Sequence, residues 1–178
     1  NSGTITASSA SGAVSGKGQV GGLVGYSDGS IASSHALGNV TNTGTSDGAG
    51  GLVGTSEGSI TDSYASGNVT SPSASYAGGL VGYSDGNISL SYASGEVRGE
   101  YGVGGLVGWA NSWSGALNTI EKSHASGLVI ATDENSGGLV GIAEGTKIEN
   151  GYASGSVTGT RTVGGLVGSF GGESRVGG

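Results

Sequence analysis

The chain has 178 residues, of which 42 are glycine and only 11% are charged, and its formal net charge is -7. This negative balance argues against nucleic-acid phosphates or an anionic membrane surface as the partner, and no apolar run reaches the ~20 residues of a membrane span. Cysteine is absent, which excludes disulfides, thiolate chemistry and a Cys-ligated zinc site.

The pentapeptide Gly-Gly-Leu-Val-Gly recurs along the chain at intervals of 29, 28, 26, 33 and 27 residues. Its six copies begin at Gly21, Gly50, Gly78, Gly104, Gly137 and Gly164. The first repeat lacks its pentapeptide half, and the last lacks its second half. We therefore expect residues 1–178 to form a single repeat domain that is excised from a longer chain and cut within a repeat at both ends.

A short polar segment follows each of the early pentapeptides. Its copies are Ser27-Asp28-Gly29, Ser56-Glu57-Gly58 and Ser84-Asp85-Gly86. They predict tight turns with glycine at positive φ. The aligned acids are Asp28, Glu57, Asp85 and Glu144. Calcium requires six to eight oxygen ligands, so turn formation explains these acids better than a metal site does, and we expect no metal.

The next segment aligns in three apolar columns. The first is Ile5, Ile31, Ile60, Ile88, Ile120 and Ile148. The second is Ala10, Ala36, Ala65, Ala93, Ala125 and Ala153. The third is Val14, Val40, Val69, Val97, Val129 and Val157. Within residues 63–69 the odd positions are small or apolar and the even positions are polar or aromatic, which is typical of a half-buried strand with its small set inward.

No single repeat can bury its own Ile, Leu and Val side chains, but stacked repeats bring each column into a ladder with strands ~4.8 Å apart. The sequence therefore predicts an all-β fold, a parallel β-solenoid (β-helix) with about one 27-residue repeat per coil. Leu52 and Val53 cannot both point inward from a flat strand, so one of them must lie at a bend. The paired glycines are expected to allow close approach between coils.

The repeat departs most from itself between Gly108 and Ile120, where the segment is six residues longer than its counterpart after Gly82. An exposed loop with Trp109, Asn111 and Trp113 would be suited to stacking on a sugar ring or anchoring a protein partner. In the alternative interpretation, Trp109 occupies a structural column and Trp113 covers a small cluster of the loop itself. That column is Tyr26, Thr55, Tyr83, Trp109, Ile142 and Ser169.

A second candidate surface is an aromatic column that the alternation places outward. After Ser9 it consists of His35, Tyr64, Tyr92, His124 and Tyr152. Such a stripe on a flat sheet would be able to bind glycan or protein. Stacking between neighbouring strands, which makes the face rigid, is the structural alternative.

No catalytic arrangement accompanies these columns. The serine column is Ser8, Ser34, Ser63, Ser91 and Ser123. No histidine base lies at a constant offset from it, and an inward hydroxyl ladder is the better interpretation. Asp47, Asp62 and Asp133 fall in different registers, so no pair of catalytic carboxylates is expected. A threonine row for ice binding is interrupted, because the equivalents of Thr41 include Arg98 and Ile130.

The pentapeptide followed by a Ser-Tyr-Ala-Ser-Gly-x-Val strand resembles the GLUG repeat, which is named for its Gly-Leu-hydrophobic-Gly core. The resemblance covers almost the whole chain. It implies a β-solenoid in an extracellular bacterial setting, because the class occurs in large secreted or surface-attached proteins, among them adhesin-like exoproteins and the non-catalytic regions of IgA-cleaving metallopeptidases. It brings no catalytic residues, and the zinc signature His-Glu-x-x-His is absent.

We therefore expect a non-catalytic structural or adhesive module of a bacterial cell-surface or secreted adhesin, joined to flanking domains of the same chain. It would act as a rigid extension and bind host or environmental glycan or a surface protein. The alternative is the substrate-binding or accessory region of a secreted polysaccharide lyase, hydrolase or peptidase, and the third hypothesis is an ice-binding solenoid. No cofactor, nucleic acid partner or direct membrane insertion is expected.

Overall fold

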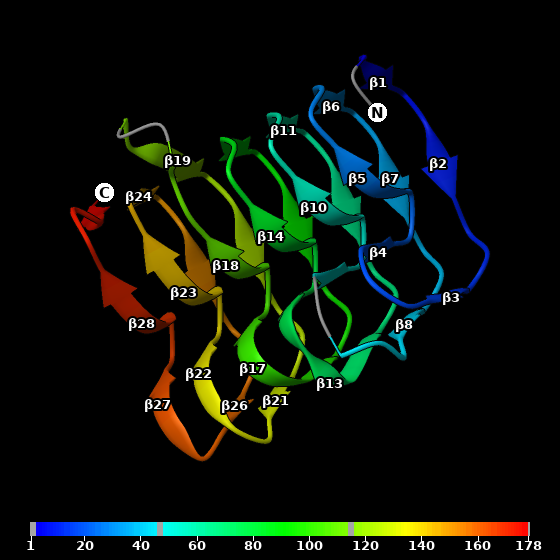
Figure 1. The fold of residues 1–178 in the computed structure, drawn as a ribbon. Coiled ribbons are helices and arrows are strands. Elements are labelled where there is room, and N and C mark those ends of the chain that lie inside the picture. The colour runs from blue at the N-terminus through cyan, green and yellow to red at the C-terminus, as the bar shows by residue number, and fades with distance from the viewer. Residues whose placement is uncertain (1–2, 46–47, 114–115, 178) are drawn as a thin grey trace.

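The computed structural model describes residues 3–45, 48–113 and 116–177, and its regular secondary structure in these ranges is entirely β. The pairings between the described strands are all parallel. The chain winds through successive coils that lie side by side, with the described ends at opposite ends of the stack (Figure 1). The predicted parallel β-solenoid is confirmed.

Four sheets run along the stack, and each takes one strand or a pair of strands from every coil. The isoleucine sheet contains β1 (Ile5–Thr6), β6 (Ile31–Ala32), β11 (Ile60–Thr61), β15 (Ile88–Ser89), β19 (Asn118–Glu121), β24 (Thr146–Glu149) and β29 (Arg175–Gly177). The ring sheet contains β2 (Ser9–Ala10), β7 (His35–Ala36), β12 (Tyr64–Ala65), β16 (Tyr92–Ala93), β20 (His124–Ala125) and β25 (Tyr152–Ala153).

The other two sheets complete each coil. The valine sheet contains β3 (Val14–Gly16), β8 (Val40–Asn42), β13 (Val69–Gly78), β17 (Val97–Gly104), β21 (Val129–Ala131) and β26 (Val157–Thr158), joined by β4 (Val20–Gly21), β9 (Ala49–Gly50), β22 (Glu134–Gly137) and β27 (Arg161–Gly164). The pentapeptide sheet contains β5 (Val24–Ser27), β10 (Val53–Ser56), β14 (Val81–Ser84), β18 (Val107–Ala110), β23 (Val140–Glu144) and β28 (Val167–Gly171).

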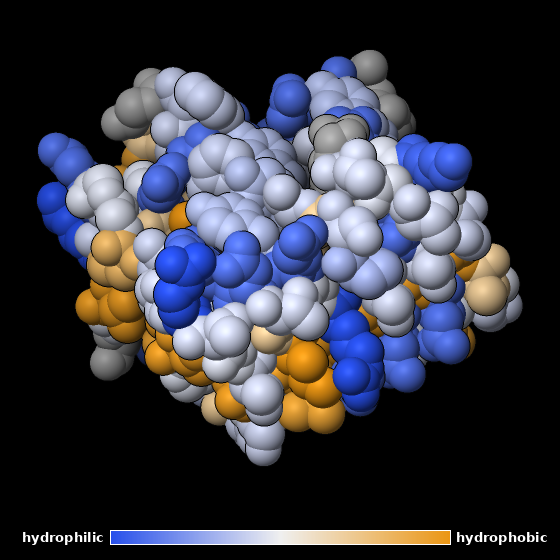
Figure 2. All heavy atoms as spheres, turned by 60° about the horizontal axis from the view of Figure 1, so that its bottom comes forward, coloured by the Kyte–Doolittle hydropathy of each residue, from blue (hydrophilic) through white to orange (hydrophobic). Residues whose placement is uncertain are grey.

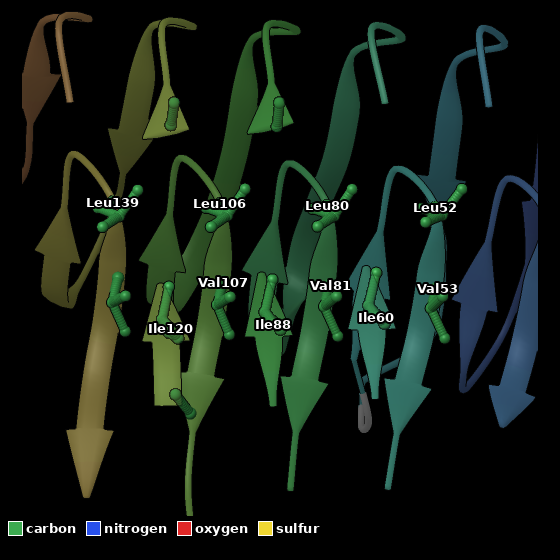
Figure 3. Packing of buried hydrophobic residues seen from close by; sticks show 14 of the residues in the cluster. Leu52, Val53, Ile60, Leu80, Val81, Ile88, Leu106, Val107, Ile120 and Leu139 are labelled. Carbon is green, nitrogen blue, oxygen red and sulfur yellow. The ribbon is translucent and has the colours of Figure 1, made fainter. Parts of the chain in front are cut away.

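The core is a set of ladders of identical side chains. Ile60 pairs with Ile31 and Ile88, and the leucines and valines of successive pentapeptides stack beside them (Figure 3). Leu52 and Val53 are both fully buried. This is possible because the chain bends at Gly51 and Leu52 before β10 begins at Val53, so Leu52 is the residue at the bend. The inward set of residues 63–69 is buried as predicted.

Glycine serves a different purpose at the corners than the turn pattern predicts. Gly29, Gly58 and Gly86 are not among the residues with positive φ in the described chain, so that part of the prediction is wrong. A Cβ at Gly58 would lie 2.1 Å from the carbonyl oxygen of Gly29, and one at Gly86 would lie 2.2 Å from that of Gly58. Glycine is required at these corners because the backbones of adjacent coils leave no room for a side chain.

A left-handed backbone instead occurs two residues after each isoleucine of the first column, at positions that are not glycine. These residues are Ala7, Ser33, Asp62, Leu90, Lys122 and Asn150, with φ between 48° and 51°. Each turns the chain from the isoleucine sheet into the ring sheet. The isoleucine ladder also extends further than the repeat suggests, because Val176 pairs with Ile148. The last repeat therefore does not lack its whole second half.

None of the described residues form a helix that is long and apolar enough to span a membrane. The surface seen when the lower side of the stack is turned forward mixes hydrophilic and hydrophobic residues (Figure 2).

Candidate functional site

The predicted aromatic column forms a continuous stack on the outer side of the ring sheet. The ring centroids of His35 and Tyr64 lie 4.7 Å apart with 1° between their planes. The following pairs lie at 4.8, 5.1 and 4.7 Å with interplanar angles of 3°, 8° and 4°. His35, Tyr64, Tyr92 and His124 are half-buried, and Tyr152 is exposed. We call this column the ring ladder.

Stacking determines what the ring ladder can offer a ligand. Because consecutive rings lie face to face, the faces of Tyr64, Tyr92 and His124 are covered by their neighbours. A ligand would meet ring edges and hydroxyl groups rather than the flat faces on which a sugar ring stacks. The geometry is that of the structural alternative, cross-strand stacking between coils.

Buried serines link neighbouring coils by hydrogen bonds at the corner that precedes the ring ladder. The backbone N–H of Ser34 donates to the Oγ of Ser63 at 3.1 Å, and the Oγ of Ser63 donates to the carbonyl oxygen of Thr61 at 2.8 Å. The same pair of bonds recurs at Ser91 and Ser123. The inward hydroxyl ladder predicted from the sequence is therefore confirmed, and these hydroxyl groups are engaged in structure.

The inserted segment separates its two tryptophans. Trp109 lies in β18, paired with Tyr83 on one side and Ile142 on the other, so it occupies the structural column of the second interpretation. Trp113 lies outside any strand and is 75% exposed. The expectation that Trp113 covers a small cluster of its own loop is wrong, because its indole N–H instead donates to the hydroxyl of Tyr83.

Polar contacts tie the inserted segment to the coil before it. The backbone N–H of Trp113 donates to the Oδ1 of Asp85 at 3.3 Å, and the amide of Asn118 donates to the same oxygen at 3.0 Å. Asn111 is buried, and its amide nitrogen lies 3.5 Å from the hydroxyl of Tyr83. The corner acid Asp85 therefore holds the insertion against the preceding coil, and Asn111 lies beside the hydroxyl of Tyr83.

A groove of about 430 Å³ lies next to this column, between the pentapeptide sheet and the end of β13. Its lining includes Gln19, Thr55, Ser75, Tyr76, Tyr83 and Trp109. Thr55, Tyr83 and Trp109 are register partners on β10, β14 and β18, which lie side by side in Figure 1. We call this site the aromatic groove.

The rings of the groove are packed against one another at an angle rather than in a stack. The centroids of Tyr76 and Trp109 are 4.7 Å apart with 43° between their planes, and Tyr83 meets Trp109 edge-on at 5.1 Å. The ring centroids of Tyr101 and Tyr76 lie 6.0 Å apart with 61° between their planes. Burial is the main cause that raises the pKa of both Tyr76 and Tyr83, so both keep their hydroxyl proton at neutral pH.

Tyr76 is the part of this site that the sequence reasoning missed. It lies near the end of β13, where the pairing with β17 shifts register between Ser71 and Ser75. Its φ is 63°, and the matching position of the next coil is Gly102 at 61°. The available signal was the length of this segment, since eight residues lie between Val69 and Gly78 but only six lie between Val97 and Gly104.

The described residues contain no group of three or more His, Asp or Glu side chains that is arranged to hold a metal ion. The register of the valine sheet places Thr41, Thr70, Arg98 and Ile130 in one row across neighbouring strands. The interruption of the threonine row that would bind ice is therefore present in the structure as well.

A family model described as the GLUG motif matches residues 16–41, 45–70, 73–98 and 132–158, which together make up more than half of the chain. The segment with the insertion lies between the last two matches. No curated protein matches the chain, and no solved structure does.

Proposed function

Since this chain belongs to the family of GLUG-motif repeats, whose β-solenoid is a structural rather than a catalytic repeat, we propose that it is a rigid, adhesive module of a secreted or surface-attached bacterial protein. In this role it holds a binding surface away from the cell and carries no reaction of its own. Flanking domains of the same chain would complete the protein.

The observation that carries the proposal is the continuity of the backbone ladder. Seven strands of the isoleucine sheet follow one another in register, and the six spacings of ~4.8 Å between them correspond to a length of about 29 Å. Each coil is hydrogen-bonded to its neighbours through four sheets. A stack of repeats resists bending when every repeat is bonded to the next on all of its sides. Stiffness of this kind is what an extension requires.

Adhesion rests on the character of the surface. The exposed positions are mainly Ser, Thr, Gly and Asn with few charges, so association through contact chemistry is favoured over long-range electrostatic attraction. Aromatic side chains are grouped at the ring ladder and the aromatic groove. Aromatic residues are the side chains that most often carry binding energy at protein surfaces.

Stiffness is tested by the distance between two labels. Ser11 and Ser154 are exposed and follow Ala10 and Ala153, which are the first and last alanines of the ring sheet. Five strand spacings separate these two alanines, or about 24 Å. Because the chain has no cysteine, spin labels on Ser11→Cys and Ser154→Cys report this distance alone. We expect one narrow peak near this value, and a broad distribution would refute the rigid extension.

Adhesion is tested by exposing the immobilised module to arrays of glycans and of extracellular host proteins. We expect saturable binding to at least one class, and we expect no product when the module is incubated with polysaccharides or peptides. Turnover of either substrate would refute the non-catalytic role. Absence of binding to both arrays would remove adhesion and leave only the extension.

A further inference from the structure

The aromatic groove combines ring surfaces with uncharged hydrogen-bonding groups. Tyr76, Tyr83 and Trp109 supply the rings, while Gln19, Thr55 and Ser75 supply amide and hydroxyl groups. No carboxylate, ammonium or guanidinium group is among the described residues that line it. Its volume of about 430 Å³ lies within the range of about 300–1,000 Å³ that is usual for small-molecule sites.

This chemistry matches a neutral sugar. A pyranose ring presents an apolar face of C–H groups, which packs on an aromatic ring, and a rim of hydroxyl groups, which exchanges hydrogen bonds with amides and hydroxyls. An anionic glycan would meet no cation among the described residues of the lining, and the net charge of -7 would repel it. A folded protein partner would need a contact area of about 800 Å² on each side, so most of its contacts would lie outside the groove.

The fold holds the rings of the groove in place. Tyr76 lies against Gly102, where an added Cβ would be 2.8 Å from its Cδ1 atom, and it keeps a left-handed backbone that tyrosine rarely adopts. Trp109 is placed by packing alone, because its buried indole N–H has no hydrogen-bond partner among the described residues. The left-handed backbone belongs to this corner of the coil, since Gly102, Asn135 and Thr162 share it in the following coils. The indole N–H of Trp109, buried without a partner among the described residues, lowers stability, which is consistent with a ring retained for a ligand.

The ring ladder does not compete for this ligand. Both faces of its inner rings, Tyr64, Tyr92 and His124, are covered by their neighbours. The rings of the groove are instead tilted or edge-on to one another and border an open volume. We propose that the aromatic groove is a carbohydrate site that binds one or two residues of a neutral oligosaccharide. This inference rests on the adhesive part of the proposed function and names its ligand class.

The experiment is a titration of the whole chain with neutral pentasaccharides of glucose, mannose and N-acetylglucosamine, followed by calorimetry and tryptophan fluorescence. The repeat itself provides the variants, because other coils show which residue each position tolerates. Trp109→Ile copies Ile142, Tyr83→Thr copies Thr55, and Tyr76→Gly copies Gly102. We expect at least one pentasaccharide to bind and each variant to weaken it by about tenfold or more.

Controls separate the groove from the rest of the surface. Phe170→Ala removes an exposed aromatic ring outside the groove, at a position where the preceding coil has Ala143, and its affinity should remain within about twofold of the parent. Trp109→Phe keeps a ring in the groove and should lose less affinity than Trp109→Ile. Circular dichroism of each variant verifies the fold, and three independent positions keep the test valid if one variant does not fold.

Several results would overturn the carbohydrate site. Binding that survives all three groove substitutions but is lost in Tyr92→Ser would place the ligand on the ring ladder. A preference for sialylated or uronic acid glycans would refute the neutral class. Binding of host proteins with no glycan binding would refute the site while leaving the adhesive module intact, and binding of neither would refute the adhesive role together with the site.

Discussion

At the scale of single residues, the buried serines show how a polar side chain stabilises the corner of a coil. Each hydroxyl accepts a backbone N–H from the preceding coil and donates to a carbonyl of its own coil. No water is needed to satisfy these groups, although Ser34, Ser63 and Ser91 are all buried. The hydroxyl ladder therefore connects neighbouring coils at the point where the backbone turns.

We predict that Ser63→Ala lowers the free energy of unfolding by about 1–3 kcal/mol, because the buried N–H of Ser34 loses its acceptor. Urea denaturation followed by circular dichroism measures the change. The matched control is Ser66→Ala, at an exposed position directly after β12, which should change stability by less than about 0.5 kcal/mol. Equal effects at the two serines would contradict this role for the hydroxyl ladder.

The left-handed corner residues carry a different cost. Leu90 is exposed and has a φ of 51°, a conformation that costs an ordinary side chain roughly 1–2 kcal/mol and suits asparagine better. Because the same corner two coils later is Asn150, we predict that Leu90→Asn raises the free energy of unfolding by about 0.5–1 kcal/mol. Leu37→Asn, at an exposed leucine without positive φ, should show no such gain, and a loss of stability at Leu90 would refute the argument.

At the scale of one coil and its neighbour, the second glycine of each pentapeptide controls how closely the coils stack. A Cβ at Gly79 would lie 2.1 Å from the carbonyl oxygen of Gly105 and 2.8 Å from the Cβ of Ala93. Both obstacles belong to residues that cannot rotate away. The same column ends at Gly165, where a Cβ would meet no atom within 4 Å.

The two ends of this column therefore form a natural pair for an experiment. We predict that Gly79→Ala lowers the free energy of unfolding by about 3 kcal/mol through overpacking between coils. Gly165→Ala should remain within about 0.5 kcal/mol of the parent. Both are measured by urea denaturation. Similar losses at the two positions would show that backbone conformation, rather than coil contact, requires glycine there.

At the scale of the whole molecule, four tyrosines and one lysine have pKa values raised above their ordinary values. Burial is the first cause that raises the pKa of Tyr76, Tyr83 and Tyr92, a hydrogen bond with Glu57 raises that of Tyr26, and a hydrogen bond with Glu121 raises that of Lys122. A raised pKa means that the folded chain holds the proton more tightly than the unfolded chain. The resulting stability is complete below the unfolded value and is lost as the pH rises.

We therefore predict that the free energy of unfolding falls as the pH increases above about 10, where unfolded tyrosine and lysine titrate. Urea denaturation at a series of pH values from neutral to strongly alkaline measures this slope. Tyr92→Phe, which keeps a stacked ring but removes one titrating hydroxyl, should make the slope shallower. A stability that rises through this range would refute the linkage.

The sequence predicts the position of a residue that recurs in every repeat. It does not predict the position of a residue that is set by contacts within one coil. The columns of Ile60, Ala65 and Val69 were predictable, because a residue that recurs at coil spacing must meet its own copies. The outward position of Tyr64 followed from alternation alone. Tyr76 was missed, since its position depends on a register shift in β13 that no recurring residue marks and that only the longer segment between Val69 and Gly78 indicates.

The sequence by itself established the parallel stack, its register and the inward and outward sets, because these follow from periodicity, which is a property of the order of residues. Only the tertiary structure decided that Gly58 is needed for coil contact rather than for positive φ, that the faces of the ring ladder are covered, and that Tyr76 meets Trp109 beside an open groove. These outcomes depend on distances between backbones and on the directions of rings, and residues far apart in the chain set both only when the coils come together.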